Sequence, residues 1–202
     1  MITLQKIQEA QKRIAPFINY TPLIHSKHLS NNSTVKLKLE SLQITGSFKL
    51  RGAINKLLSL NKEQKQKGVI AVSTGNHGKG VAYAANILGI KSTIFMSSMV
   101  PLFRKKAIEA FGAKVEIVGS NSDEADQYAK ELAKKENITL IHPFDDEEII
   151  AGQGTVGLEM LETFPEVDTV VVPTSGGGLS GGIALAIKLQ KPEVKIVAAS
   201  MK

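Results

Sequence analysis

The sequence of 202 residues contains no cysteine and no tryptophan, and each absence removes a class of function. Without cysteine the chain forms no disulfide, offers no thiolate nucleophile and has no cysteine ligand for a metal. Three tyrosines without aromatic-basic interleaving disfavour nucleic-acid binding. No apolar run approaches the length of a membrane span, and the amphipathic N-terminus lacks the apolar core of a signal peptide. We therefore expect a cytoplasmic protein with no nucleic-acid or membrane partner.

The composition is that of an ordinary globular protein, with 43% hydrophobic and 22% charged residues. The formal net charge of +6 suggests an anionic partner, but the lysines are scattered over several predicted helices. The densest cluster, KEQKQK at 62–67, falls in a predicted connection between elements. A solvated basic face is the better interpretation of the charge.

Short β-branched runs alternate with segments of helical periodicity, which predicts an α/β fold with parallel sheets and helices on both faces. The predicted strands cover 35–40, 69–74, 92–97, 114–119, 139–143, 169–174 and 195–200. The predicted helices cover 47–59, 77–88, 101–111, 121–136, 147–163 and 179–190. The four strands between 69 and 143 are enough for a compact α/β unit. The last strand ends at Ser200, and we expect its sheet to be incomplete.

The stretch TGSFKLRGA, residues 45–53, places a lysine where a helix is predicted to begin. Ser47 is the expected N-cap, and Leu50, Ile54 and Leu57 follow at helical spacing. This spacing assigns the core face and leaves Lys49 on another side of the helix. From the residues alone, Lys49 is either a solvated lysine, which is the common case, or a nucleophile directed at a site.

A first glycine-rich loop, STGNHGKG at 73–80, joins a predicted strand directly to a predicted helix. Its backbone N–H groups at the helix start form a potential anion site. The alternative is a plain turn in which Asn76 caps the helix and His77 lies in its first turn.

A second loop, PTSGGGLSGG at 173–182, is richer in glycine than a plain turn requires and favours close wrapping of an oxyanion such as a phosphate. Gly176, Gly178 and Gly181 also match the dinucleotide-binding pattern G-x-G-x-x-G. That pattern needs an acidic residue at the end of the next strand, where this sequence has Ser200. A dinucleotide site is therefore disfavoured.

Several segments, in order along the chain, resemble the fold-type II pyridoxal-phosphate enzymes of the threonine dehydratase and serine racemase branch. They are TPL (21–23), KLESLQITGSFKLRGA (38–53), STGNHGKGVAYAA (73–85), FGAKVEIVGSNSDEA (111–125), IHPFDDEEIIAGQGTVGLE (141–159) and PTSGGGLSGG (173–182). Sister branches fit less well: cysteine synthases have a threonine in place of His77, and threonine synthases have an acidic residue in place of Leu50.

The resemblance implies a tryptophan synthase β-like α/β fold with two parallel-sheet domains, the larger one truncated at its C-terminus. Residues 1–46 would form the first segment of the large domain, 47–144 the small domain, and 145–202 the second, incomplete segment of the large domain. In relatives the partner of the pyridine nitrogen and the metal site of the racemases lie further along the chain. We therefore predict no metal ligand in this sequence.

By the same resemblance, Lys49 forms the internal Schiff base with pyridoxal 5'-phosphate, and a depressed pKa would make its amine a usable nucleophile and base. Phe48 would pack against the pyridine ring or be an ordinary core residue, and Asn76 would bind the ring hydroxyl. The predicted phosphate loop comprises Ser175, Gly176, Gly177, Gly178 and Leu179. The loop predicted to receive the substrate carboxylate comprises Ser73, Thr74, Gly75, Asn76 and His77.

The implied activity is a PLP-dependent threonine/serine dehydratase, an ammonia-lyase that yields a 2-keto acid and ammonia through an aminoacrylate. Thr74 is a second predicted catalytic residue, but it does not decide the reaction. Dehydratases usually have a small apolar residue there, and racemases have a serine that acts as the second acid/base. Serine racemase activity and an inactive N-terminal fragment of such an enzyme are the alternatives. A complete enzyme is expected to bind a small amino-acid substrate and to form a homo-oligomer, a dimer or a tetramer.

Overall fold

The computed structural model describes residues 1–200 and confirms the predicted α/β fold. The helices are α1 (Leu4–Ile14), α2 (Lys49–Ser59), α3 (Lys62–Lys67), α4 (Asn76–Ile87), α5 (Leu102–Glu109), α6 (Ser122–Glu136), α7 (Glu147–Thr163) and α8 (Gly178–Lys188). The strands are β1 (Leu23–His25), β2 (Lys36–Lys38), β3 (Val69–Val72), β4 (Ser92–Met96), β5 (Lys114–Ile117), β6 (Thr139–Leu140), β7 (Thr169–Pro173) and β8 (Lys195–Ala199). Two short 3-10 helices are η1 (Ala15–Phe17) and η2 (Glu40–Leu42).

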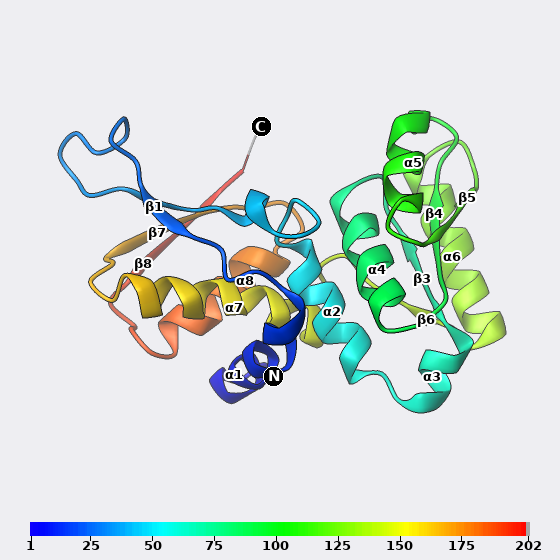
Figure 1. The fold of residues 1–202 in the computed structure, drawn as a ribbon, viewed down its shortest axis with the longest axis horizontal. Helices are drawn as coiled ribbons and strands as arrows, with labels where there is room; N and C mark the ends of the chain where they lie inside the picture. Colours follow the sequence, from blue (N-terminus) through cyan, green and yellow to red (C-terminus); the bar gives the residue numbers. More distant parts are fainter. Residues whose placement is uncertain (201–202) are drawn as a thin grey trace.

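Strands β3 to β6 form one parallel sheet in the order β5-β4-β3-β6. Helix α6 packs on one face of this sheet, and α4 and α5 pack on the other (Figure 1). Ile70 and Phe95 pack with Ala129 of α6, whereas Ala71 and Ile94 belong to the core on the α4 side. Both faces of these strands are apolar, as a parallel sheet covered on both sides requires.

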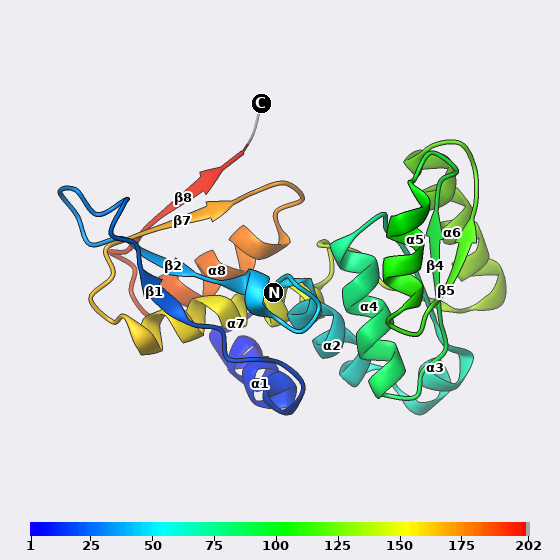
Figure 2. The same cartoon turned by 45° about the horizontal axis from the view of Figure 1, so that its top comes forward.

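Strands β7 and β8 form a separate two-stranded parallel sheet, and β1 pairs with β2 in an antiparallel one (Figure 2). Val170 and Val172 pack with Ile183 of α8, but Val171, on the opposite face of β7, is 64% exposed. The prediction of helices on both faces is therefore wrong for this sheet within residues 1–200. Strand β1 was not predicted, because three residues are too few to show a period.

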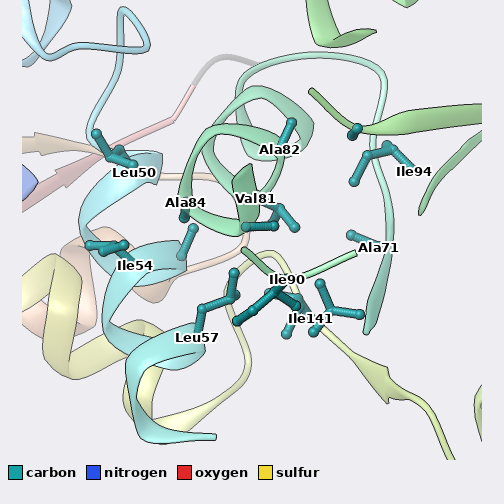
Figure 3. Close-up of a cluster of buried hydrophobic side chains, with 14 of the residues drawn as sticks. Leu50, Ile54, Leu57, Ala71, Val81, Ala82, Ala84, Ile90, Ile94 and Ile141 are labelled. Carbon is teal, nitrogen blue, oxygen red and sulfur yellow. The ribbon is translucent and has the colours of Figure 1, made fainter. Parts of the chain in front are cut away.

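The molecule has two regions, one around the four-stranded sheet and one around the β7–β8 sheet. Helix α2 lies between them, in contact with α4 on one side and α7 on the other (Figures 1 and 2). Figure 3 shows Leu50, Ile54 and Leu57 of α2 in one buried cluster with residues of α4 and of the four-stranded sheet. The core face predicted for this helix is thus confirmed. Lys49 lies outside that face, at the first residue of α2.

Two local expectations are wrong. The KEQKQK segment is a helix, α3, and not a connection, because Asn61 and Gln64 form a capping box that satisfies its first turn. Ser47 does not cap α2: Phe48 occupies the N-cap position, and the α2 N-terminus has no side-chain cap. The Ser47 hydroxyl is instead buried without a hydrogen-bond partner in the described part of the chain.

Candidate active site

The strand order of the four-stranded sheet determines where a crevice forms. Strand β3 is first in the chain, and its neighbours β4 and β6 lie on opposite sides of it. The connections after β3 and β6 therefore diverge at the carboxyl edge of the sheet, which is where ligands bind in open α/β sheets. The two loops at this switch point are 73–75 and 141–146.

Lys49 extends from the start of α2 to this switch point. Its Nζ donates a hydrogen bond to the carbonyl oxygen of Pro143, in the loop after β6, at 2.7 Å. Nζ also lies 5.3 Å from the ring centroid of Phe48. Burial lowers the pKa of the Lys49 amine, and no carboxylate among residues 1–200 pairs with it to restore the charge. The amine is therefore shifted toward its neutral, nucleophilic form.

His77 lies at the same switch point, in the first turn of α4. It is buried, and its Nε2 donates to the carbonyl oxygen of Ile141 at 2.9 Å. Burial lowers the pKa of His77 to about 4, and the charge of nearby Lys49 adds to the effect. His77 is thus a neutral residue that ties the loop after β3 to the loop after β6.

Between β3 and the first residue of α4, Thr74 and Asn76 have side chains that make no hydrogen bond to the protein within residues 1–200, whereas Ser73 does. The Ser73 hydroxyl accepts hydrogen bonds from the backbone N–H groups of Gly75 at 3.2 Å and Gly78 at 2.8 Å, which closes the turn. The carbonyl oxygen of Thr74 accepts from Arg104 Nη1 at 3.3 Å. Within residues 1–200 the Thr74 hydroxyl and the Asn76 amide hydrogen-bond to no protein group. Both remain available to a ligand.

The second glycine loop meets the loop after β6. Gly177 has φ +85°, a left-handed conformation that favours glycine, and it precedes α8, whose N-terminus has no side-chain cap. A Cβ at Gly176 would lie 2.2 Å from the ring of Phe144, and one at Gly178 would lie 2.9 Å from the Phe144 carbonyl oxygen. Because Lys49 bonds to the residue before Phe144, the amine and the glycine loop flank the same short segment.

The remaining predicted residues of this loop have different environments. The side chain of Leu179 packs against the core cluster formed by β7, α7 and α8, so only its backbone is placed to contact a ligand. Ser175 is not buried, and its hydroxyl makes no hydrogen bond among the described residues. Pro143, Phe144 and Arg104 were missed by sequence reasoning. The available signal was the position of Pro143 and Phe144 at the end of the predicted strand 139–143, within a segment that resembles the family.

These groups fit a phosphorylated aldehyde. An aldehyde reacts with the neutral form of an amine, and burial shifts Lys49 toward that form; a phosphate is bound by uncapped backbone N–H groups at a glycine-rich helix start, which α8 provides. The buried hydroxyls of Thr45 and Ser47, close to Lys49 in the chain, have no partner among the described residues. Such orphaned polar groups are rare in folded proteins, so each calls for an explanation, and a bound ligand is one.

Comparison with known proteins agrees with this fit. Residues 14–202 match the family described as "Pyridoxal-phosphate dependent enzyme". The L-threonine dehydratase catabolic TdcB of Staphylococcus aureus (strain N315) is 49% identical over 200 residues, which is 98% of this chain and 58% of that protein. Maize serine racemase superposes with a TM-score of 0.94 at 38% identity, over 98% of this chain and 61% of the other. The processed form of threonine deaminase isoform 2 from Solanum lycopersicum superposes with a TM-score of 0.93 at 35% identity, over 97% and 55%.

The chain therefore belongs to the pyridoxal-phosphate-dependent enzymes of fold type II. Within them it falls in the threonine dehydratase and serine racemase branch, as its motifs predicted. The chain spans 58% of the length of the S. aureus threonine dehydratase that it matches. In residues 1–200 no helix has the length and apolar character needed to cross a membrane.

Proposed function

We propose that the protein is a PLP-dependent L-threonine/L-serine ammonia-lyase that produces a 2-keto acid and ammonia. The observation that carries the proposal is the Lys49 amine, whose pKa burial lowers, which has no carboxylate partner among residues 1–200 and which lies beside the uncapped glycine loop. The names of the relatives, threonine dehydratase and threonine deaminase, support the same reaction class.

When bound, the cofactor supplies an electron sink for the charge that develops at the substrate α-carbon. The Lys49 amine would hold the cofactor through its aldehyde, and it would take the proton from the substrate α-carbon as a general base. A lowered pKa increases the fraction of the neutral amine at a given pH, and this favours both roles. The burial that lowers the pKa of Lys49 is therefore the functional property of this position.

The loop at 73–77 would hold the substrate carboxylate. Its backbone N–H groups lie at the start of α4, where the helix dipole favours negative charge. The Asn76 amide, which has no hydrogen-bond partner within residues 1–200, would hydrogen-bond the cofactor ring hydroxyl. The phosphate would be held by Ser175 and the backbone of Gly176, Gly177, Gly178 and Leu179. His77, being neutral, adds no charge that would attract water into the site.

Cofactor attachment is tested by adding PLP, reducing with borohydride and locating the modified lysine by peptide mass spectrometry. We expect Lys49 to carry the label and the Lys49→Ala variant to lose both the label and the Schiff-base absorbance. Lys56→Ala is the matched control, because Lys56 lies on the same helix and is paired with Asp146 at 2.6 Å. Unchanged absorbance in Lys49→Ala would refute the assignment, and production of a keto acid from L-threonine or L-serine tests the reaction itself.

Serine racemase activity is the second candidate, favoured by the Thr74 hydroxyl, which hydrogen-bonds to no protein group within residues 1–200. Maize serine racemase is also among the similar structures. The β-branched side chain of threonine restricts its rotamers, and this places racemisation second. Chiral analysis after incubation with L-serine decides the question: D-serine that disappears in Thr74→Val would establish the second activity, and absence of D-serine would exclude it.

We further propose that residues 47–144 form a small domain that closes on a large domain made of 1–46 and 145–202. The four-stranded sheet lies in the first range and the other two sheets lie in the second. A substrate held at 73–77 and a phosphate held at 175–179 would bridge the two and exclude water. A cytoplasmic homo-oligomer, a dimer or a tetramer, remains our expectation for the whole protein, tested by its mass in solution.

A further inference from the structure

Two residues after Lys49, the guanidinium of Arg51 is completely buried, at 0% exposure. Its Nε and Nη2 donate to the two carboxylate oxygens of Glu40 at 2.8 Å each. Its Nη1 and Nη2 donate to the two oxygens of Glu159 at 2.6 and 2.9 Å. Lys38 Nζ also donates to Glu159, so two cations face two anions. We call these four residues the buried ion network.

Stability does not by itself account for the buried ion network. Desolvating four charges is costly, and a well-packed apolar set of similar volume is often as stable or more stable. The network instead supplies directional contacts. The rigid fork of an arginine engages both oxygens of each carboxylate, which fixes the position of the guanidinium relative to η2 and to α7.

The backbone around Lys49 is approached closely from two sides. A Cβ at Gly80 of α4 would lie 3.1 Å from the carbonyl carbon of Lys49. A Cβ at Gly152 of α7 would lie 2.6 Å from the carbonyl oxygen of Arg51. The first turn of α2 is therefore held between two other helices at backbone distance, where a small displacement cannot be absorbed by side chains.

We propose that Arg51 is a positioning residue for Lys49. By fixing the first turn of α2 against η2 and α7, its two-carboxylate fork keeps the Lys49 amine at the Pro143 carbonyl and out of water. The inference rests on the proposed role of Lys49, but it concerns the protein without cofactor and can be tested there. Loss of the fork would let the first turn of α2 shift, so that the Lys49 amine becomes more hydrated and a larger fraction of it is protonated.

The test is reductive methylation of the protein with formaldehyde and cyanoborohydride, which modifies neutral amines. Peptide mass spectrometry gives the rate at Lys49 relative to Lys56 on the same helix, from pH 6 to 9. In Arg51→Lys, which keeps the charge but loses the fork, we expect this ratio at pH 7.5 to fall about tenfold. Tenfold corresponds to about 1.4 kcal/mol of differential stabilisation between the neutral and the charged amine, which is moderate for an amine that changes from buried to hydrated. Glu40→Gln should lower the ratio in the same direction.

Arg13→Met is the matched control, because Arg13 also ties α2 to α7, through Asn55 and Glu148, but near the middle of α2 and one turn after Arg51. Its ratio should stay within about twofold of the original, with folding checked by circular dichroism. An unchanged ratio in Arg51→Lys and Glu40→Gln, or an equal fall in Arg13→Met, would overturn the inference. Unfolding of Glu40→Gln would also overturn it, because the network would then be required for the fold as a whole.

Failure of this inference and failure of the proposed function can be distinguished. If formaldehyde modifies Lys49 in an Arg51-dependent way but PLP and borohydride never label it, the positioning holds and the cofactor role of Lys49 fails. If PLP labels Lys49 equally well in Arg51→Lys and in the original protein, the cofactor role holds and the positioning fails.

Discussion

The four-stranded sheet and the β7–β8 sheet are both parallel, yet their strands are buried in different ways. In β3 and β4 nearly every residue is buried, with helices on both faces of the sheet. In β7 burial alternates, so that Val170 and Val172 face α8 while Val171 lies exposed. The sequences VIAV and TVVVP are almost equally β-branched. Hydrophobicity of a strand therefore does not reveal how many of its faces are covered.

The two sheets also contribute different numbers of loops to the candidate site. The four-stranded sheet has a switch point between β3 and β6, and the loops there carry Thr74, Asn76, His77 and Pro143. The β7–β8 sheet contributes one loop, the glycine loop before α8. Lys49 belongs to the helix between the two regions. The site is thus formed where both regions and their connecting helix meet.

The largest expected loss of stability follows from replacing Arg51, which joins α2 to η2 and α7. Arg51→Met would leave Glu40 and Glu159 with only Lys38 as a cation, and removal of one partner from a buried ion network costs about 3–5 kcal/mol. Urea unfolding should show this loss. Arg13→Met, at a half-exposed pair, should cost about 0–1 kcal/mol. Similar losses in the two variants would contradict the prediction.

The second-largest loss of stability is expected in the four-stranded sheet, which helices cover on both faces. Ile94 of β4 is completely buried in the core on the α4 side of the sheet, and Ile94→Ala should lower the free energy of unfolding by about 2–5 kcal/mol through lost packing and a residual cavity. The readout is the urea midpoint, with the denaturant slope checked for constancy. A cost below about 1 kcal/mol would mean that this face is less well packed than described.

A pH effect of about 3 kcal/mol is expected in the four-stranded region. The pKa of His77 is about 4 in the folded protein and near 6.5 in the unfolded chain, so below pH 6.5 the unfolded state binds more protons. The neutral imidazole therefore contributes stability above pH 6.5 that is lost as the pH falls toward 4. Comparison of His77→Gln with the original protein at each pH isolates this contribution, because other acid-sensitive groups are shared. Parallel stability curves for the two would refute it.

The smallest effect is expected on the open face of the β7–β8 sheet. Val171→Thr replaces an exposed valine with a side chain of the same shape, and surface changes of this kind stay within about 0.5 kcal/mol. Thermal unfolding of the variant should match that of the original. A loss above about 1 kcal/mol would show that Val171 is covered in solution, for example by a second copy of the chain.

Sequence reasoning predicted most elements to within a few residues, because β-branched runs, glycine loops and helical spacing are local signals. It missed β1, which is too short for a period, and α3, whose capping box outweighs its polar composition. It assigned Ser47 a capping role that the structure does not show. The candidate site residues from the two loops and Lys49 were named from motifs, and their roles remain predictions.

The sequence by itself determined the α/β class, the core stripe of α2 and the family, since each depends on residue order and spacing. Only the tertiary structure decided the environment of Lys49. The hydrogen bond to Pro143 joins residues 94 positions apart in the chain, and the burial that lowers the pKa of the amine comes from segments that meet only on folding. The pairing of Arg51 with Glu159, 108 positions away, was likewise invisible in the sequence. Charge, burial and partner are properties of assembled surfaces, and no local pattern records them.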